Sequence, residues 1–322
     1  MVATTAAPKA VGRGGGAAMP EMRRGLRLVS FMPLFNHALG FHPLNAPMAP
    51  EPALPLQQHP NFAAALRRLG QPVRVTALSN AAPVINLRRF GVTFASRGPV
   101  WAEDVPCEAR WADLQQSGLR LINADTQEPA TYKQAGFRMI TTPAFVAELD
   151  LTETTETRLT HMKAKWRNAW RRAQDASFRT DIRPFALHRH GWLLEADLAQ
   201  QRRKGFRTLP HAILKAYADC RPHDTIVFTA TRKRTPIAAM LFLRHGPVAT
   251  YHLGWTGAEG RAQNAHHGLL TAAADWLAAR GHIRLDLGHV DTETAPGLAR
   301  FKIGTGAKIT PLGGTWLRLP GR

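Results

Sequence analysis

The chain has 322 residues, of which 44% are hydrophobic, and this is enough for about two domains that each bury a core. It carries 42 Lys plus Arg against 23 Asp plus Glu, a formal net charge of +19. Its two cysteines, Cys107 and Cys220, exclude a framework of several disulfides or Cys-based zinc sites. No window reaches the roughly 18 apolar residues of a membrane-spanning helix, nor does the start contain the apolar run of a secretory signal. We therefore expect a cytoplasmic protein.

The positive charge predicts an anionic partner. Nucleic acid, a phosphorylated cofactor, a nucleotide-sugar phosphate and an anionic bilayer surface would all be attracted. A GC-rich genome would also raise the arginine content without any partner.

The first part of the chain leads into a compact lobe. Residues 1–25 read as a disordered tail, an organelle transit peptide, or an extension before a true start at Met19 or Met22. Residues 26–56, rich in Pro, His and Asn, read as a loop-rich lead-in. From residue 57 to 148 we expect a first α/β lobe, which opens with a helix from Pro60 that Gly70 ends.

A second lobe is expected over residues 149–322. Its first helix follows Thr154 or Thr155 and has an apolar stripe that includes Trp166. The other face of this helix is basic. Like charges stacked on a helix repel each other, so this face either contacts phosphates or is simply solvated. The basic residues are Lys163, Lys165, Arg167, Arg171 and Arg172.

The rest of the second lobe predicts a helix pair, a three-stranded meander and a strand–helix–strand unit. The helices are expected at 191–205 and 209–220, with basic residues crowding the junction, where they complement the helix dipole or hold a phosphate. The strands are expected at 225–231, 237–244 and 248–255, followed by a helix at 265–280 and a buried strand at 283–287. The last two strands should be parallel.

A polar loop and a lone lysine follow that buried strand. Gly288 begins a loop that carries His289 and Asp291, and a short turn then brings Lys302 before a last strand at 309–319. Open α/β sheets hold their chemistry at such strand ends.

Four short sequences in this region, DLG at 286–288, PGLARFK at 296–302, GTGA at 304–307 and GGTW at 313–316, resemble the C-terminal signature of the FemAB-type members of the GNAT acyltransferase superfamily. These enzymes attach aminoacyl or other acyl groups to amines. The resemblance implies two GNAT-like lobes, each a mixed sheet flanked by helices in an α/β (α+β) fold. It also implies that Lys302 stabilises the developing charge and that Phe301 packs beside the donor. In such a fold the acyl group lies between the strands at 248–255 and 283–287.

Further residues match the family pattern. The Arg97-Gly98-Pro99 turn resembles one beside the acceptor pocket, and Lys165-Trp166-Arg167-Asn168 resembles the K-x-R-N helix. Arg97 could equally point to water, and Lys302 could be a surface cation. The candidate catalytic residues are Lys302, Phe301 and Asp286. Candidate donor-binding residues are Tyr251, Gly254, Trp255, Asn264 and His266. Candidate substrate-binding residues are Arg97, Arg167, Arg207, His289 and Asp291.

The donor is left open. Acetyl-CoA-dependent members open the crossover helix with an Arg/Gln-x-x-Gly-x-Gly/Ala loop that holds pyrophosphate, and residues 261–268 (RAQNAHHG) lack it. This departure favours aminoacyl-tRNA or an otherwise unusual donor over acyl-CoA as the donor substrate, although the second lobe has no long charged helical hairpin. The acceptor would be an amine, such as that of a peptidoglycan precursor, and no bound cofactor is expected.

Three alternatives remain. His266-His267 with His289 and Asp291 could suggest a metal site, but the spacing of metal-binding motifs is absent and no metal is expected. The proton acceptor is unassigned among Asp286, His289, Asp291 and the substrate itself. A basic nucleic-acid-binding protein on the same scaffold would explain the charge without catalysis.

Overall fold

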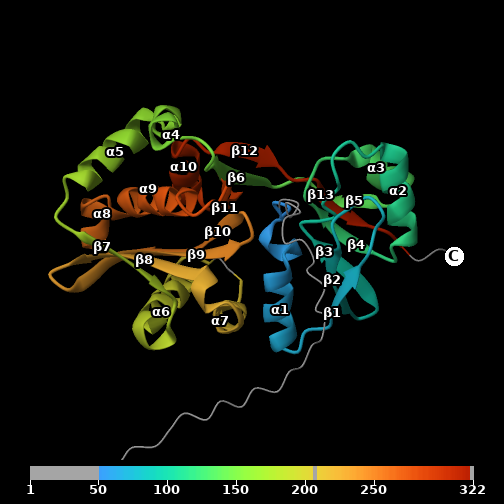
Figure 1. Ribbon diagram of the computed structural model, residues 1–322, viewed down its shortest axis with the longest axis horizontal. Coiled ribbons are helices and arrows are strands. Elements are labelled where there is room, and N and C mark those ends of the chain that lie inside the picture. The colour runs from blue at the N-terminus through green and yellow to red at the C-terminus, as the bar shows by residue number, and fades with distance from the viewer. Residues whose placement is uncertain (1–50, 206–208, 320–322) are drawn as a thin grey trace, which may run out of the picture. The chain divides into compact units, whose positions relative to one another are not determined.

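The computed structural model describes residues 51–205 and 209–319, except for the side chain of Lys204 (Figure 1). Within these ranges the chain forms two mixed sheets with helices packed on them, as predicted. The expected tail at 1–25 and most of the lead-in at 26–56 lie outside the described residues. None of the helices in the described ranges is long and apolar enough to span a membrane.

The first sheet has six strands in the order β1-β2-β3-β4-β13-β5, and only β3 and β4 are parallel neighbours. Helices α2 (Cys107–Gln116) and α3 (Pro129–Gln134) contribute Leu114 and Tyr132 to its core. There the buried Trp316 stacks on Tyr132 with ring centroids 5.1 Å apart. The strands are β1 (Val73–Thr76), β2 (Val84–Arg89), β3 (Val92–Ser96), β4 (Leu121–Ala124), β5 (Arg138–Thr141) and β13 (Gly314–Leu317).

The second sheet has seven strands in the order β12-β6-β11-β10-β9-β8-β7, and only β10 and β11 are parallel. Strand β9, inside the sheet between β10 and β8, is apolar on both faces because helices cover both sides. The strands are β6 (Phe145–Asp150), β7 (Arg179–Pro184), β8 (Thr225–Arg232), β9 (Thr235–His245), β10 (Val248–Thr256), β11 (Arg284–Val290) and β12 (Lys308–Pro311).

Two groups of helices enclose this second sheet (Figure 1). On one face lie α4 (Thr155–His161), α5 (Ala164–Gln174), α9 (Ala265–Ala278) and α10 (Pro296–Gly304). On the other face lie α1 (Pro60–Arg68), α6 (Leu187–Lys204) and α7 (His211–Cys220). The short elements are η1 (Leu56–Gln58), η2 (Pro222–Asp224) and α8 (Ala258–Ala262).

The expected division of the chain at residue 148 does not match the strand order. Strand β6 crosses that position and belongs to the second sheet, whereas β13 belongs to the first. Helix α1, expected in the first lobe, buries Phe62 and Leu66 in the same cluster as Leu214 and Tyr217 of α7. Periodicity showed that α1 has one apolar face, but it did not show which sheet that face covers.

Two expected elements are each split in two. The strand expected at 309–319 is β12 and β13, separated at Gly313, where a Cβ would lie 2.0 Å from the Thr126 carbonyl oxygen. The helix expected after Thr154 is α4 and α5, because the chain turns extended at Met162 and Lys163. The Lys163 amide donates instead to the Gly304 carbonyl at 3.0 Å, which fixes α5 to the end of α10.

Candidate functional site

The parallel strands β10 and β11 pair over only three residues each. The last pair is Thr250 with Asp286, although both strands continue. Each strand also has an irregularity just beyond this point: β10 slips against β9 between Tyr251 and Leu253, and β11 slips against β6 between Asp286 and Gly288. Bulges of this kind change the direction of a strand and free its next residues from the ladder. The site is therefore built where the two strands part.

Lys302 reaches this point from the last turn of α10. Its side chain is buried, with 6% of the residue exposed, and Nζ donates to the His289 carbonyl at 2.7 Å. Gly288 has φ of +77°, a backbone conformation that favours glycine, and a Cβ there would lie 3.6 Å from Nζ, so the loop passes close to the ammonium. Burial lowers the pKa of Lys302 to about 8, against the opposing effect of the Asp286 carboxylate. The ammonium is thus held in a water-poor environment.

A row of buried charges joins Asp286 to the first sheet. Arg97, directly after β3, donates to the Asp125 carboxylate and, through Nη1, to Asp286 Oδ2 at 3.3 Å. The other oxygen of Asp286 accepts from the Gly288 amide at 2.7 Å. Burial disfavours the charged guanidinium, but Asp125 and Asp286 outweigh it and raise the pKa of Arg97. Arg97 is 7% exposed and two of its guanidinium nitrogens are paired with these carboxylates, so its contact with a substrate anion stays a prediction.

Phe301 lies in an aromatic cluster between α5, α9 and α10. Its ring centroid is 5.7 Å from that of Trp166 and 5.3 Å from that of His267. Trp166 also contacts His267 at 4.8 Å. The buried Trp166 Nε1 and His267 Nδ1 have no hydrogen-bond partner in the described part of the chain. Phe301 thus packs beside the first turn of α9, where the resemblance places the donor.

The expected donor-binding residues gather around the end of β10. His266 Nε2 lies 2.8 Å from the Trp255 carbonyl, and burial lowers the pKa of His266 to about 4, so this histidine ties α9 to β10 as a neutral donor. The Tyr251 hydroxyl lies where a side chain at Gly254 would be, with Oη 1.9 Å from an ideal Cβ. Asn264 precedes α9 with φ of +51° and makes no side-chain cap.

The expected substrate-binding residues are not all available. Asp291 accepts from the amides of Glu293 at 3.0 Å and Thr294 at 2.8 Å, so its carboxylate shapes its own loop. Arg167 is half-buried and donates to the Leu159 carbonyl at 3.3 Å. His289 is exposed at the end of β11. Arg207 lies outside the described residues.

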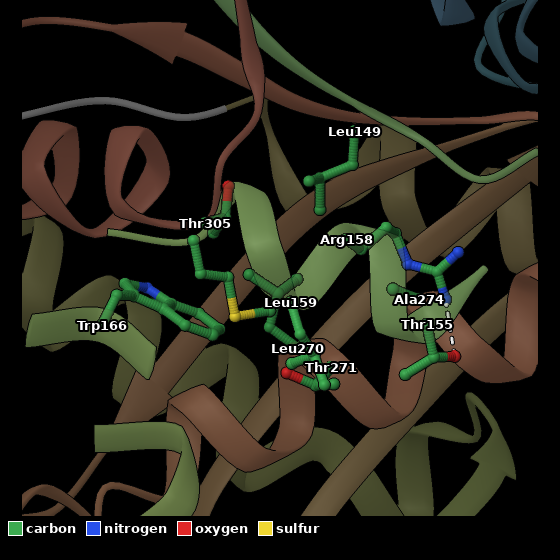
Figure 2. Close-up of a pocket in the computed structure, with 10 residues that line it drawn as sticks. Leu149, Thr155, Arg158, Leu159, Trp166, Leu270, Thr271, Ala274 and Thr305 are labelled. Carbon is green, nitrogen blue, oxygen red and sulfur yellow. Dashed lines mark hydrogen bonds between the residues drawn. The ribbon is translucent and has the colours of Figure 1, made fainter. Parts of the chain in front are cut away.

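Figure 2 shows a cavity under α4 and α5, lined by Leu149, Met162, Trp166 and other mostly apolar side chains. Its volume of about 10 Å³ has room for about one water and none for a substrate. A larger hollow of about 550 Å³ lies around the start of β11 and the end of β6, with Arg284, Glu148 and Asp150 in its wall. It is at the opposite end of β11 from Lys302.

Sequence reasoning missed three residues with an evident part in this region. Asp125 follows β4 and is the partner of Arg97. Asp197 and His211 come from α6 and α7 and form a pair at 2.8 Å. Asp125 could have been found from its place after a buried strand, whereas no spacing rule joins Asp197 to His211.

Comparisons with known proteins address the fold. The chain is similar to the crystal structure of FemX, with a TM-score of 0.64 and 14% identity over 81% of this chain and 93% of FemX. It is also similar to the C-terminal domain of a putative lysylphosphatidylglycerol synthetase from Agrobacterium fabrum, with a TM-score of 0.53 and 14% identity over 82% and 88%. L-PGS from Bacillus licheniformis matches with a TM-score of 0.52 and 15% identity over 83% and 94%.

No protein-family model matches the sequence, and no curated protein does. The fold is therefore assigned from its architecture. The chain has two mixed sheets and a parallel β10–β11 pair joined through α9, and its structural neighbours cover most of the chain. Together these findings confirm the predicted fold, which is similar to that of FemX.

Proposed function

We propose that the protein is an N-acyltransferase that moves an acyl or aminoacyl group from a phosphorylated donor to an amine. The observation that carries the proposal is Lys302, a buried ammonium fixed where β10 and β11 part. Acyl transfer passes through a tetrahedral oxyanion, and a preorganised cation in a water-poor site stabilises that charge. Binding of nucleic acid alone does not explain a desolvated lysine in this position, whereas acyl transfer does.

The donor is proposed to be aminoacyl-tRNA rather than acyl-CoA. The glycine-containing loop typical of CoA-dependent members is missing, and the space beside the first turn of α9 holds Trp166, His267 and Phe301. No basic residue of α5 forms an ion pair with a carboxylate within residues 51–205 and 209–319. These free cations suit the phosphates of a nucleic acid.

Ligand-dependent stabilisation tests the proposal directly. Total tRNA charged with amino acids, uncharged tRNA, acetyl-CoA and a UDP-linked muropeptide are each added to the purified protein, and unfolding is followed by calorimetry. A ligand at 100 times its Kd stabilises the fold by about 2.7 kcal/mol. Charged tRNA with an amine acceptor should also yield a new amide in a radiolabel assay. If only acetyl-CoA supports transfer, the donor is acyl-CoA and not aminoacyl-tRNA. If no combination of donor and amine acceptor gives transfer, the proposed acyltransferase function is wrong.

The pH dependence of this transfer is a further prediction. Because the pKa of Lys302 is about 8, the ammonium that stabilises the oxyanion is lost as the pH rises through that value. We expect kcat/KM to fall above about pH 8, and to fall less steeply in Lys302→Arg, whose guanidinium stays protonated. A profile that is flat to pH 10 in the wild type would contradict a charged role for Lys302.

Reversing charge on α5 should weaken tRNA binding. Lys163 and Arg171 are both exposed and lie eight residues apart on one face, so Lys163→Glu with Arg171→Glu leaves the buried side intact. We expect the affinity to fall and the slope of log K against log[salt] to decrease by about one for each lost phosphate contact. Filter binding at several salt concentrations measures both.

The matched control is Arg74→Glu with Arg88→Glu on β1 and β2, which makes the same change in net charge at two exposed arginines of the first sheet. If both double variants weaken binding equally, only net charge matters and the α5 face is not the contact.

A further inference from the structure

A buried carboxylate on α6 is paired with a histidine on α7. Asp197, on α6, is 2% exposed. Its Oδ2 accepts from Gln201 Nε2 at 2.5 Å and lies 2.8 Å from His211 Nε2. The side chains of Asp197 and His211 are 3% and 12% exposed, so the pair is largely removed from water.

His211 is the nitrogen base of this pair. Because Asp197 accepts the hydrogen bond, Nε2 carries the proton and Nδ1 is left with a lone pair. Nδ1 has no partner in the part of the chain that the structure describes, and 12% of the side chain is exposed. One imidazole nitrogen fixed by a carboxylate and the other free is the arrangement by which a histidine takes and returns a proton.

A second histidine faces the same carboxylate from the bulge of β10. His252 is the residue left over in the slip between Tyr251 and Leu253, and its ring makes no hydrogen bond within the described ranges. Burial lowers the pKa of His252 to about 4; Asp197 acts against this shift and His211 adds to it. Burial and Asp197 together raise the pKa of the neighbouring Tyr251. His252 is therefore a neutral, unpartnered acceptor near the Asp197–His211 pair.

The position of this group relates it to Lys302. Thr250 and Asp286 are the last paired residues, and His252 on β10 and Gly288 on β11 each come two residues later. His252 and the glycine beside Lys302 thus both lie just beyond the point where the strands part, with α6 and α7 on one face of the sheet and α10 on the other. Gln200 Nε2 donates to the Gly254 carbonyl at 3.4 Å and fixes α6 against this end of β10.

We propose that Asp197, His211 and His252 form the acceptor side of the site, where His211 takes the proton that the acceptor amine loses and Asp197 positions His211. This inference rests on the proposed acyl transfer. The amine nitrogen forms a bond to the donor carbonyl carbon, and the carbonyl electrons move to the oxygen beside Lys302. The amine proton passes to His211 Nδ1 while His252 accepts a second N–H hydrogen bond. Collapse of the oxyanion breaks the bond to the leaving oxygen, which takes the proton from His211.

A purely structural role is the competing account, since the pair also joins α6 to α7. His211→Gln separates the two, because an amide nitrogen can still donate to Asp197 whereas a glutamine cannot take the proton. We expect kcat to fall by roughly 10²–10⁴, with the donor KM unchanged and the acidic limb of the kcat profile lost. His211→Ala should lose kcat to the same extent and regain part of it with added imidazole.

The matched control is His59→Gln, because His59 also lies next to a carboxylate, 3.0 Å from Glu51, at the start of helix α1. This variant should alter stability and leave the pH profile of kcat unchanged. If His211→Gln keeps wild-type kcat and its acidic limb while Lys302→Ala is inactive, the acceptor-side proposal is wrong and acyl transfer stands.

A second measurement does not need transfer. Lysinamide serves as a probe amine, and the imidazole Cε1 resonances of the full chain are followed by NMR and assigned with His211→Gln and His252→Asn. We expect shifts at His211 and His252 that disappear in Asp197→Asn. If no donor supports transfer, the proposed function fails; shifts at these two resonances would still support an amine site, and their absence would overturn it.

Discussion

Lys302→Ala should lower kcat/KM by roughly 10²–10³, which is about 3–4 kcal/mol of transition-state stabilisation on the scale of a lost oxyanion donor. The ammonium is buried and fixed by the His289 carbonyl, so it needs little reorganisation when the charge develops. The measurement is kcat/KM with charged tRNA and an amine acceptor. Lys308→Ala, at an exposed lysine of β12, is the control. A Lys302→Ala variant within threefold of the wild type would remove Lys302 from the mechanism.

The same residue should limit stability. Burial lowers the pKa of Lys302 to about 8 from its ordinary value of 10.5, so the folded chain binds the proton more weakly than the unfolded chain does. The buried charge therefore lowers the free energy of unfolding. This effect is fully present below pH 8, decreases as the pH rises, and is absent above pH 10.5. Lys302→Met should therefore raise the free energy of unfolding at pH 7 by up to about 3 kcal/mol, although the active site is lost. Denaturant titrations at pH 7 and pH 10.5 would show whether the gain is confined to the lower pH.

Arg97→Met should be the most destabilising of the substitutions considered. It leaves Asp286, whose side chain is 7% exposed, and Asp125, at 18%, without their cation. Removing one partner from a buried ion pair costs about 3–5 kcal/mol because an uncompensated charge remains. Chemical denaturation at pH 7 measures the loss.

The control for Arg97 is Arg68→Met, since the ion pair of Arg68 with Asp219 is 56% exposed on both sides and should cost less than about 1 kcal/mol. Adding Asp286→Asn to Arg97→Met should recover part of the stability by removing one of the two orphaned charges. If Arg97→Met lowers the free energy of unfolding no more than Arg68→Met does, the charges of Arg97, Asp125 and Asp286 are solvated and do not hold the two sheets together.

The sequence predicted the architecture better than it predicted the contacts. Periodicity was enough to place the helix expected at 265–280 and the strand expected at 283–287, because local burial patterns determine both. The glycine boundaries were less accurate, since the helix ends at Ala278 and the strand continues through Gly288 to Val290. The parallel pairing of β10 with β11 followed from a strand, helix and strand in succession. The position of Lys302 at a strand end was deduced in the same way.

Long-range partners could not be predicted in this way. Arg97 and Asp286 are 189 positions apart, and an Arg-Gly-Pro turn gives no sign of which carboxylate its arginine meets. The Asp197–His211 pair depends on how α6 packs against α7, which neither helix reveals alone. His252 is significant only because β10 is bulged, and a bulge has no clear signal in a stretch that otherwise alternates normally.

The place of β13 affects how the chain is made. Its residues, Gly314–Leu317, pair with β4 on one side and the edge strand β5 on the other, so β5 can join the first sheet only when nearly the last segment of the described chain has been made. During synthesis at about 5–20 residues per second, β4 and β5 emerge early and keep unpaired edges until the second sheet has been translated. Exposed edges of this kind recruit other strands. The nascent first lobe should therefore be prone to aggregation until β13 has been synthesised, and a stop codon before Gly314 should yield insoluble protein rather than a shortened fold.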